Sequence, residues 1–421
     1  MKVDFYYPEI AGVEIPDKNL LGVFKPNIRD CNLNVEDLIL ETLNKPISTK
    51  KLNQELNSGD KILILSDDNT RATPVDKILK VLLPYLHDLG IKKEDIIILM
   101  ALATHRPMSR QELISKLGQQ IVEEYKVVNH LWDKEEQNIY YGKTSKGIKV
   151  YGNKLVKEAD FIIGLGHIVP HRVAGFSGGG KIAQPGVCTG VTTGETHWMS
   201  ALVPGTEIIG KRDNLIREQI DEAARLMGLN FIINVVQDLK GRVVGVFAGD
   251  LVDAHRVGCE LAKEVYGVKI PKADIIITDS YPADIELWQA AKGIYSSELV
   301  VKENGYVILV TPCPEGVAKT HPEIEEFGYQ TLEETEKLIN EGKLKEMSVA
   351  AHLVHVGRVI KEKANGILVS PNIPNEVKEK LGFISADSVQ EALSYALNKK
   401  GKDASVVVML HAGEILPINS E

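Results

Sequence analysis

A glycine-rich segment in the middle of the chain presents one lysine that could do covalent chemistry. Residues 175–181 read GFSGGGK and match the spacing of a phosphate-binding loop. The next residue is Ile182, where such a loop needs serine or threonine to hold magnesium, so we expect no nucleoside triphosphatase. A lysine in a tight loop of low polarity loses its proton readily and can bond to a carbonyl or thiocarbonyl carbon. Lys181 is therefore a candidate nucleophile, and a solvated surface lysine is the alternative.

Three histidines lie around this lysine in the sequence, namely His167, His171 and His197. The first two would form a metal-binding pair on a helix, but Pro170 between them makes a helix improbable there. A single histidine is more often a hydrogen-bonded structural residue than a ligand. Three imidazoles near one reactive lysine favour a functional site.

Polar residues also follow two predicted strands, and ligands of open α/β sheets bind beyond the carboxyl ends of strands. The sequence DDNTR occupies 67–71 and THRP occupies 104–107. We expect both loops to converge with the glycine-rich segment, although a helix cap with a salt bridge would also explain 67–71. Further along, Gln289 and Lys292 share one helical face, for which an exposed polar pair is the alternative.

These segments, in order along the chain, resemble the nickel-pincer lactate racemase family. The matching residues are DDNTR (67–71), THRP (104–107), PHRVAGFSGGGK (170–181), PG (185–186), ETHWM (195–199) and QAAK (289–292). The resemblance implies two α/β domains with mostly parallel sheets and an active site in the cleft between them. It also implies a cofactor made by dedicated cofactor-biosynthesis proteins: pyridinium-3,5-bisthiocarboxylic acid mononucleotide, the nickel-pincer nucleotide, which carries nickel and is tethered to a lysine.

The resemblance assigns a role to each matching position. Lys181 is similar to the tethering lysine, and His197 is similar to the single protein ligand of nickel. His105 and His171 match a pair of acid/base histidines. The residues expected to hold the substrate are Arg71, Gln289 and Lys292, and those expected to line the cofactor pocket are Asp68, Thr70, Ser177, Gly178 and Gly179.

The chemistry implied by the resemblance is racemisation or epimerisation of a 2-hydroxy acid. Removing the C2 hydrogen as hydride avoids a carbanion beside the carboxylate, and one histidine can serve the hydroxyl of each enantiomer. Lactate-acting members carry a tyrosine where this chain has Trp288, and a later tryptophan where His352 is the candidate replacement. Two alternatives stay open: a nicotinamide-dependent dehydrogenase, although the GLG at 164–166 lacks the third glycine at Val169, and a non-catalytic nickel or cofactor carrier.

The elements that must position these residues alternate between β-branched runs and amphipathic stretches, which indicates an α/β fold. Helices are expected at 74–89, 109–125, 213–227 and 251–266, a hairpin at 140–151, and an irregular segment at 167–200. The expected strands are 61–66, 95–101, 160–165, 231–236, 243–247, 274–278, 306–310, 366–370 and 405–410.

Length and composition bound the remaining possibilities. At about 150 residues per domain, 421 residues predict two to three domains, and a connector at 267–272 places the boundary. We expect a first domain at 1–268, a second at 269–403, and a tail at about 404–421 that returns to the first. The net charge of -9 disfavours nucleic acid, and the longest apolar run, 96–103, is far short of the roughly 20 residues of a membrane span.

The four cysteines point to a reducing compartment. Cys31, Cys188, Cys259 and Cys313 are widely spaced and form no CxxC motif. With an N-terminus that lacks the apolar stretch of a secretory signal, they favour a cytoplasmic protein.

Overall fold

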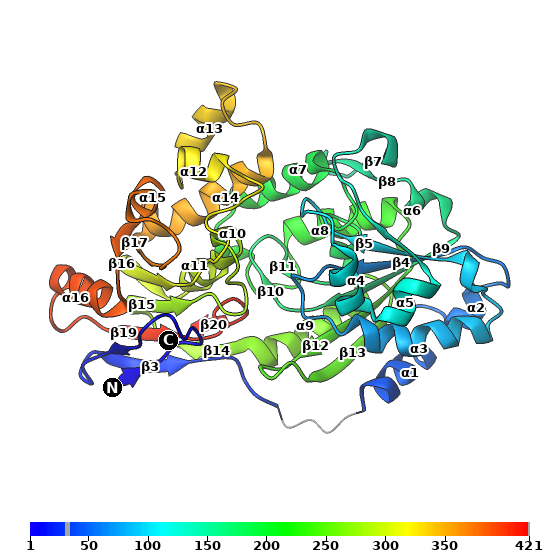
Figure 1. The fold of residues 1–421 in the computed structure, drawn as a ribbon, viewed down its shortest axis with the longest axis horizontal. Coiled ribbons are helices and arrows are strands. Elements are labelled where there is room, and N and C mark those ends of the chain that lie inside the picture. Colours follow the sequence, from blue (N-terminus) through cyan, green and yellow to red (C-terminus); the bar gives the residue numbers. More distant parts are fainter. Residues whose placement is uncertain (30–33, 420–421) are drawn as a thin grey trace.

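The computed structural model describes residues 1–29 and 34–419, and Cys31 lies outside this range. Its two main sheets lie at opposite ends of the molecule (Figure 1). The first sheet has the strand order β13-β12-β9-β4-β5-β6, parallel throughout except for β13. Its strands are β4 (Ile62–Asp67), β5 (Ile96–Ala101), β6 (Lys126–Asn129), β9 (Phe161–His167), β12 (Phe231–Gln237) and β13 (Val243–Gly249).

Helices cover both faces of this sheet, which is why its central strands are continuous apolar runs. One face packs on α1 (Val35–Asn44) and α3 (Val75–Asp88), with α2 (Leu52–Glu55) beside them. The other face packs on α8 (Leu215–Leu226) and the start of α9 (Asp253–Tyr266), with α6 (Leu155–Glu158) nearby. The expected α/β layering is confirmed.

The second sheet is wholly parallel, in the order β18-β17-β16-β15-β19-β3. Its strands are β3 (Leu20–Phe24), β15 (Ala273–Asp279), β16 (Val301–Val310), β17 (Ala364–Val369), β18 (Ile384–Ala386) and β19 (Val406–Met409). One face packs on α11 (Lys292–Ser297) and α14 (Met347–Gly357), and the other packs on α16 (Val389–Lys400). The remaining helices here are α10 (Leu287–Ala290), α12 (Glu323–Phe327), α13 (Leu332–Asn340) and α15 (Asn375–Lys380).

The chain ends do not follow the expected division between the two sheets. The strand β19 lies inside the second sheet, between β15 and β3, so this part of the tail does not return to the first sheet, and β3 also belongs to the second. All four residues of β19 are buried, and their apolar pattern predicts an inner strand without indicating which sheet receives it. The connector instead forms β14 (Gly267–Ile270), which pairs with β20 (Leu416–Asn419). A short pair, β1 (Lys2–Val3) and β2 (Val13–Glu14), lies near the N-terminus.

Two further expectations about local structure need correction. The helix expected over 109–125 is split into α4 (Arg110–Leu117) and α5 (Gln119–Glu124), because Gly118 adopts a φ of 94° that ends the first helix. The segment expected to be irregular contains the pair β10 (Pro170–His171) and β11 (Gly175–Phe176) and the helix α7 (Gly190–Ala201). The expected hairpin is confirmed as β7 (Asn138–Lys143) and β8 (Lys149–Asn153).

A membrane-spanning helix does not occur in the part of the chain that the structure describes, since every helix there is too short or too polar to cross a bilayer.

Candidate active site

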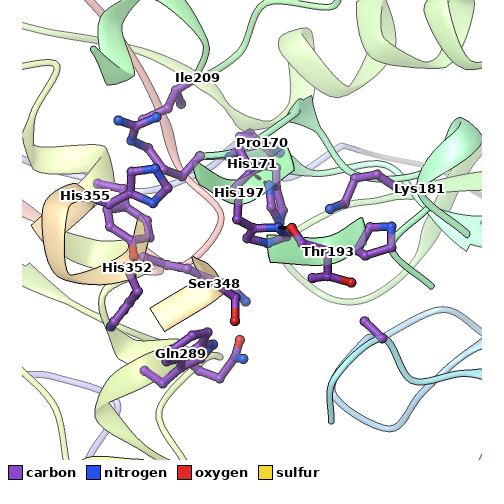
Figure 2. A pocket seen from close by; sticks show the side chains of 18 of the residues that line it. Pro170, His171, Lys181, Thr193, His197, Ile209, Gln289, Ser348, His352 and His355 are labelled. Carbon is purple, nitrogen blue, oxygen red and sulfur yellow. Dashed lines mark hydrogen bonds between the residues drawn. The ribbon is translucent and has the colours of Figure 1, made fainter. Parts of the chain in front are cut away.

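The carboxyl ends of both sheets face a shared cavity made of three adjoining hollows. The central hollow is lined from both halves of the chain, by Lys181 and His197 on one side and Gln289 and His352 on the other (Figure 2). The second hollow, called the glycine-side hollow, is lined by residues from the 177–182 segment. The third, called the tail-side hollow, is lined by Glu414 near the C-terminus. Arg71 lines all three.

The glycine-rich segment holds Lys181 at the junction of two hollows. A short 3-10 turn, Gly179–Ile182, begins after Gly178, whose φ of 76° and close approach to Asn234 leave no room for a side chain. Burial lowers the pKa of Lys181 well below its usual value, and the charges of Arg217, Arg71 and Lys292 lower it further. The shift favours the neutral amine, which is the form that a nucleophile requires.

His197 presents one free ring nitrogen to the same cavity. It lies on α7, where its Nδ1–H donates to the carbonyl of Thr193 at 2.7 Å, which leaves Nε2 with its lone pair. Burial lowers the pKa of His197 to about 4, and the charge of Lys181 contributes. A neutral imidazole with a fixed tautomer is suited to bind a metal ion.

His105 forms a short hydrogen bond with a buried carboxylate. Its Nδ1 lies 2.6 Å from Oδ2 of Asp68, whose other oxygen accepts from the backbone N–H of Thr70 at 3.0 Å and from its hydroxyl at 2.5 Å. Burial alone would raise the pKa of Asp68, but the charge and hydrogen bond of His105, helped by Arg71, lower it far below the usual value. Asp68 is therefore ionised, so Nδ1 of His105 carries the proton and Nε2 is the basic nitrogen.

His171 has the opposite arrangement. It lies on β10, and its Nδ1 accepts a hydrogen bond from the backbone N–H of Val173 at 3.1 Å, so its proton is on Nε2. Burial lowers the pKa of His171 well below 6.5, and the charges of Lys181, Arg71 and Lys292 add to this effect. The two histidines on this cavity therefore differ at rest in which ring nitrogen is a donor.

The cations of the cavity come from both halves of the molecule. The guanidinium of Arg71 donates locally, from Nη1 to the carbonyl and hydroxyl of Thr70 at 3.3 and 3.2 Å. Burial lowers the pKa of Lys292 to about 7; Arg71 lowers it too, whereas Glu414 and Asp68 raise it. The lining of the central hollow contains no carboxylate. The cavity therefore attracts an anion.

Two residues predicted to line the cofactor pocket form hydrogen bonds within the protein. The hydroxyl of Ser177 donates to the carbonyl of His167 at 2.6 Å and accepts from the N–H of Val169 at 2.9 Å. Gly179 gives its N–H to Oδ1 of Asn234 at 2.7 Å and lines none of the three hollows, so the expectation that it binds a cofactor is not supported by its position. The other predicted site residues all lie on the cavity.

Sequence reasoning missed several residues that shape the site. Lys116, buried on α4, donates to the carbonyl of Arg71 at 2.8 Å and pairs with Asp67 at 2.9 Å, which fixes the loop after β4. His321 was also missed: its ring stacks on one face of Trp288, and His352, named from the sequence together with Trp288, stacks on the other, with ring centroids 4.4 and 4.3 Å apart. A lysine at a helical position carries no local signal of burial, so Lys116 could be found only from the tertiary structure.

Comparisons with known proteins identify the family. The model of the lactate racemase N-terminal domain matches residues 6–208, and that of the lactate racemase C-terminal domain matches residues 268–415. The chain belongs to the lactate racemase family. The lactate racemases of Thermoanaerobacterium thermosaccharolyticum and Lactiplantibacillus plantarum are 34% and 33% identical to it, each match covering 72% of both chains. This member of the lactate racemase family is accordingly an isomerase.

Solved structures agree with this family assignment. The structure of the lactate racemase apoprotein from Thermoanaerobacterium thermosaccharolyticum superposes with a TM-score of 0.86 at 28% identity, covering all of both chains. A Thermotoga maritima protein shares the fold, with a TM-score of 0.74 at 24% identity over 92% of this chain and 98% of that one. The fold of two α/β halves is thus common to the lactate racemase family member described here and these proteins.

Proposed function

We propose that this protein racemises or epimerises lactate or a related 2-hydroxy acid, using a nickel-pincer nucleotide tethered to Lys181. Family membership and the similarity to two proteins named lactate racemase support the reaction class. The observation that carries the proposal is a single cavity lined by Lys181, whose pKa is lowered by burial, by His197 with a free ring nitrogen, and by the two histidines His105 and His171.

The residues present fit such a cofactor. Lys181 has the depressed pKa that amide or thioamide formation needs, and Nε2 of His197 is free to bind a metal ion. Among the described residues no group of three or more His, Cys, Asp or Glu side chains could hold a metal ion. A metal bound through His197 must therefore take its other ligands from an organic group, and soft sulfur donors with one imidazole suit nickel. When bound, this group supplies an acceptor for the hydride at C2 of the substrate.

The two cations hold the substrate carboxylate. Arg71 offers a planar fork of donors from the first half of the chain, and Lys292 offers a compact charge from the second. Gln289, on the α10 side of the central hollow, is placed to donate to or accept from the substrate oxygens. Anchoring the substrate from both sides also excludes water from the space between the two sheets.

The two histidines move the hydroxyl proton. For one enantiomer, Nε2 of His105 accepts it, and Asp68 stabilises the imidazolium that results. The opposite enantiomer presents its hydroxyl toward His171. For that enantiomer His171 must first take up a proton and become an imidazolium; it then gives its Nε2 proton to the keto oxygen and becomes neutral, while the imidazolium of His105 releases the proton it accepted. In the reverse direction the neutral ring of His171 accepts the hydroxyl proton and His105 donates.

The attachment of the cofactor is the most direct test. We expect the protein produced with the cofactor-biosynthesis proteins to carry an adduct on Lys181 and one bound nickel ion, detected by intact mass and metal analysis. Lys181→Ala should lose the adduct, the nickel and the activity, whereas His197→Ala should lose nickel and keep the adduct. An unmodified, nickel-free protein that still interconverts the enantiomers would refute the proposal.

The roles of the two histidines are tested by comparing the two directions of the reaction. His105→Gln and His171→Gln should each reduce turnover by about 10²- to 10⁴-fold, and the reduction should differ between the two starting enantiomers. Initial rates measured from pure D- and L-lactate would show this difference. Equal losses in both directions would contradict the assignment of one base to each enantiomer, and unchanged rates in the double variant would indicate a carrier.

A further inference from the structure

A carboxylate from the C-terminal tail reaches the tail-side hollow. Glu414 follows β19 and lines this hollow together with Arg71, Lys292 and His171. Within the described residues it has one ion-pair contact, to Nδ1 of His411 at 4.0 Å. Burial lowers the pKa of His411 to about 4, so that imidazole supplies no charge near pH 7. The carboxylate therefore has no cationic partner on its own segment.

The segment that carries Glu414 is fixed by buried hydrogen bonds. Asp279 accepts from the N–H groups of His411 and Ala412 at 3.1 and 2.8 Å. Ser296, on α11, donates to the carbonyls of Ala412 and Ile415 at 3.1 and 3.2 Å. Because α11 begins with Lys292, the same helix that supplies the lysine also fixes the loop that faces it.

The charges around Lys292 oppose one another. Its ammonium has no hydrogen-bond or ion-pair partner among the described residues, and both burial and the charge of Arg71 disfavour its charged form. The carboxylates of Glu414 and Asp68 favour it. Asp68 is already committed to His105, so Glu414 is the carboxylate available to Lys292.

The charges around Glu414 also connect this carboxylate with Lys292. Lys292 and Arg71 are the cations that favour its ionised form, while burial opposes it and raises its pKa. The phenol of Tyr266 is also within electrostatic range, and burial raises its pKa far above 10, so it stays neutral.

We propose that Glu414 is a positioning residue that keeps Lys292 cationic and thereby able to hold the carboxylate of the substrate. This inference rests on the proposed function, because it gives Lys292 the substrate as its ligand. Glu414 does not touch the reacting atoms. Its effect passes through the charge of one lysine, so it is strongest where that lysine titrates.

The ionisation of Lys292 can be measured without any turnover. Trace acetylation by acetic anhydride across a pH series, followed by mass spectrometry of the Lys292 peptide, gives the pH at which the amine becomes reactive. We expect a midpoint near 7 in the unaltered protein and about one pH unit lower in Glu414→Gln, with Glu414→Asp restoring it. Asp403→Asn, which removes an exposed carboxylate outside the cavity, should leave the midpoint in place.

The same change in charge predicts a pH-dependent loss of affinity. A midpoint lowered from about 7 to about 6 reduces the protonated fraction of Lys292 about eightfold at pH 7.5 and less than twofold at pH 5.5. KM for lactate in Glu414→Gln should rise by these factors, with kcat nearly unchanged.

Each outcome decides the inference. An unchanged labelling midpoint in folded Glu414→Gln would overturn it, as would an increase in KM that is the same at both pH values. If the holoenzyme acts on no 2-hydroxy acid, the proposed function fails, and the labelling midpoint still reports whether Glu414 controls Lys292.

Discussion

The two sheets each place an aspartate where a central strand ends, and the pKa values of the two carboxyl groups are shifted in opposite directions. Asp68 follows β4 in the first sheet and is ionised, since the charge and hydrogen bond of His105 outweigh the cost of burial. Asp279 ends β15 in the second sheet, and burial raises its pKa to about 7 although it accepts the N–H groups of His411 and Ala412. Both side chains are almost wholly buried.

The difference lies in the partner. An imidazole can become a cation and share a proton with the carboxylate, whereas backbone N–H groups only donate hydrogen bonds. Asp68 therefore belongs to the chemistry of the cavity, and Asp279 fixes the loop that carries Glu414. The same place in an α/β sheet thus carries a cavity residue in one half and a residue that fixes a loop in the other.

Replacing Asp68, the member of this pair that lines the cavity, should have the largest effect. We expect Asp68→Asn to reduce kcat by about 10²-fold, because an amide does not stabilise the imidazolium form of His105 and can turn its N–H₂ toward Nδ1. Thermal unfolding should change little by comparison. Steady-state rates from both enantiomers provide the measurement, and a variant with unaltered kcat would remove the distinction between the two aspartates.

Replacing Arg71 tests whether the loop after β4 in the first sheet also binds the substrate. Arg71→Lys keeps the charge and loses the two-donor fork, so KM should rise about tenfold while kcat falls by less. The backbone carbonyl of Arg71 still accepts from Lys116, which leaves the loop in place. A fall in kcat alone, with KM unchanged, would place Arg71 outside the substrate site.

Asp279→Asn should have the smallest effect on activity, within about twofold, because its role is to accept hydrogen bonds. Its folded-state pKa of about 7 lies above the unfolded value of about 3.9, so the native state binds the proton more tightly. Stability of the unaltered protein should therefore be highest at low pH and fall as pH rises from about 4 to about 7.

In Asp279→Asn the amide mimics the protonated carboxyl group, so this variant should not lose stability as pH rises. Urea unfolding at pH 4 and pH 8 would measure it: the two proteins should be similar at pH 4, and the variant should be the more stable at pH 8. A parallel loss of stability at both values would show that Asp279 acts only through its hydrogen bonds.

The segment at 167–200 shows where local sequence was insufficient. Gly190–Ala201 contains two glycines and four β-branched residues, all poor helix formers, so the sequence predicted no helix. In the structure, Thr192 donates to the carbonyl of Lys149, and Thr196 accepts from the side chain of Gln184, so the threonines are satisfied inside the first half. Packing against α14 from the other half completes the helix that carries His197.

The sequence by itself determined the α/β class, the position of Lys181 in a glycine-rich turn and the polar loops that follow β4 and β5. These depend on neighbours within a few residues, because alternation, turn residues and strand ends are local patterns. Only the tertiary structure decided that Asp68 meets His105, that β3 and β19 join the second sheet, and that Glu414 and Lys292 line one hollow. Ionisation depends on charges and burial contributed by distant parts of the chain, and no local pattern records them.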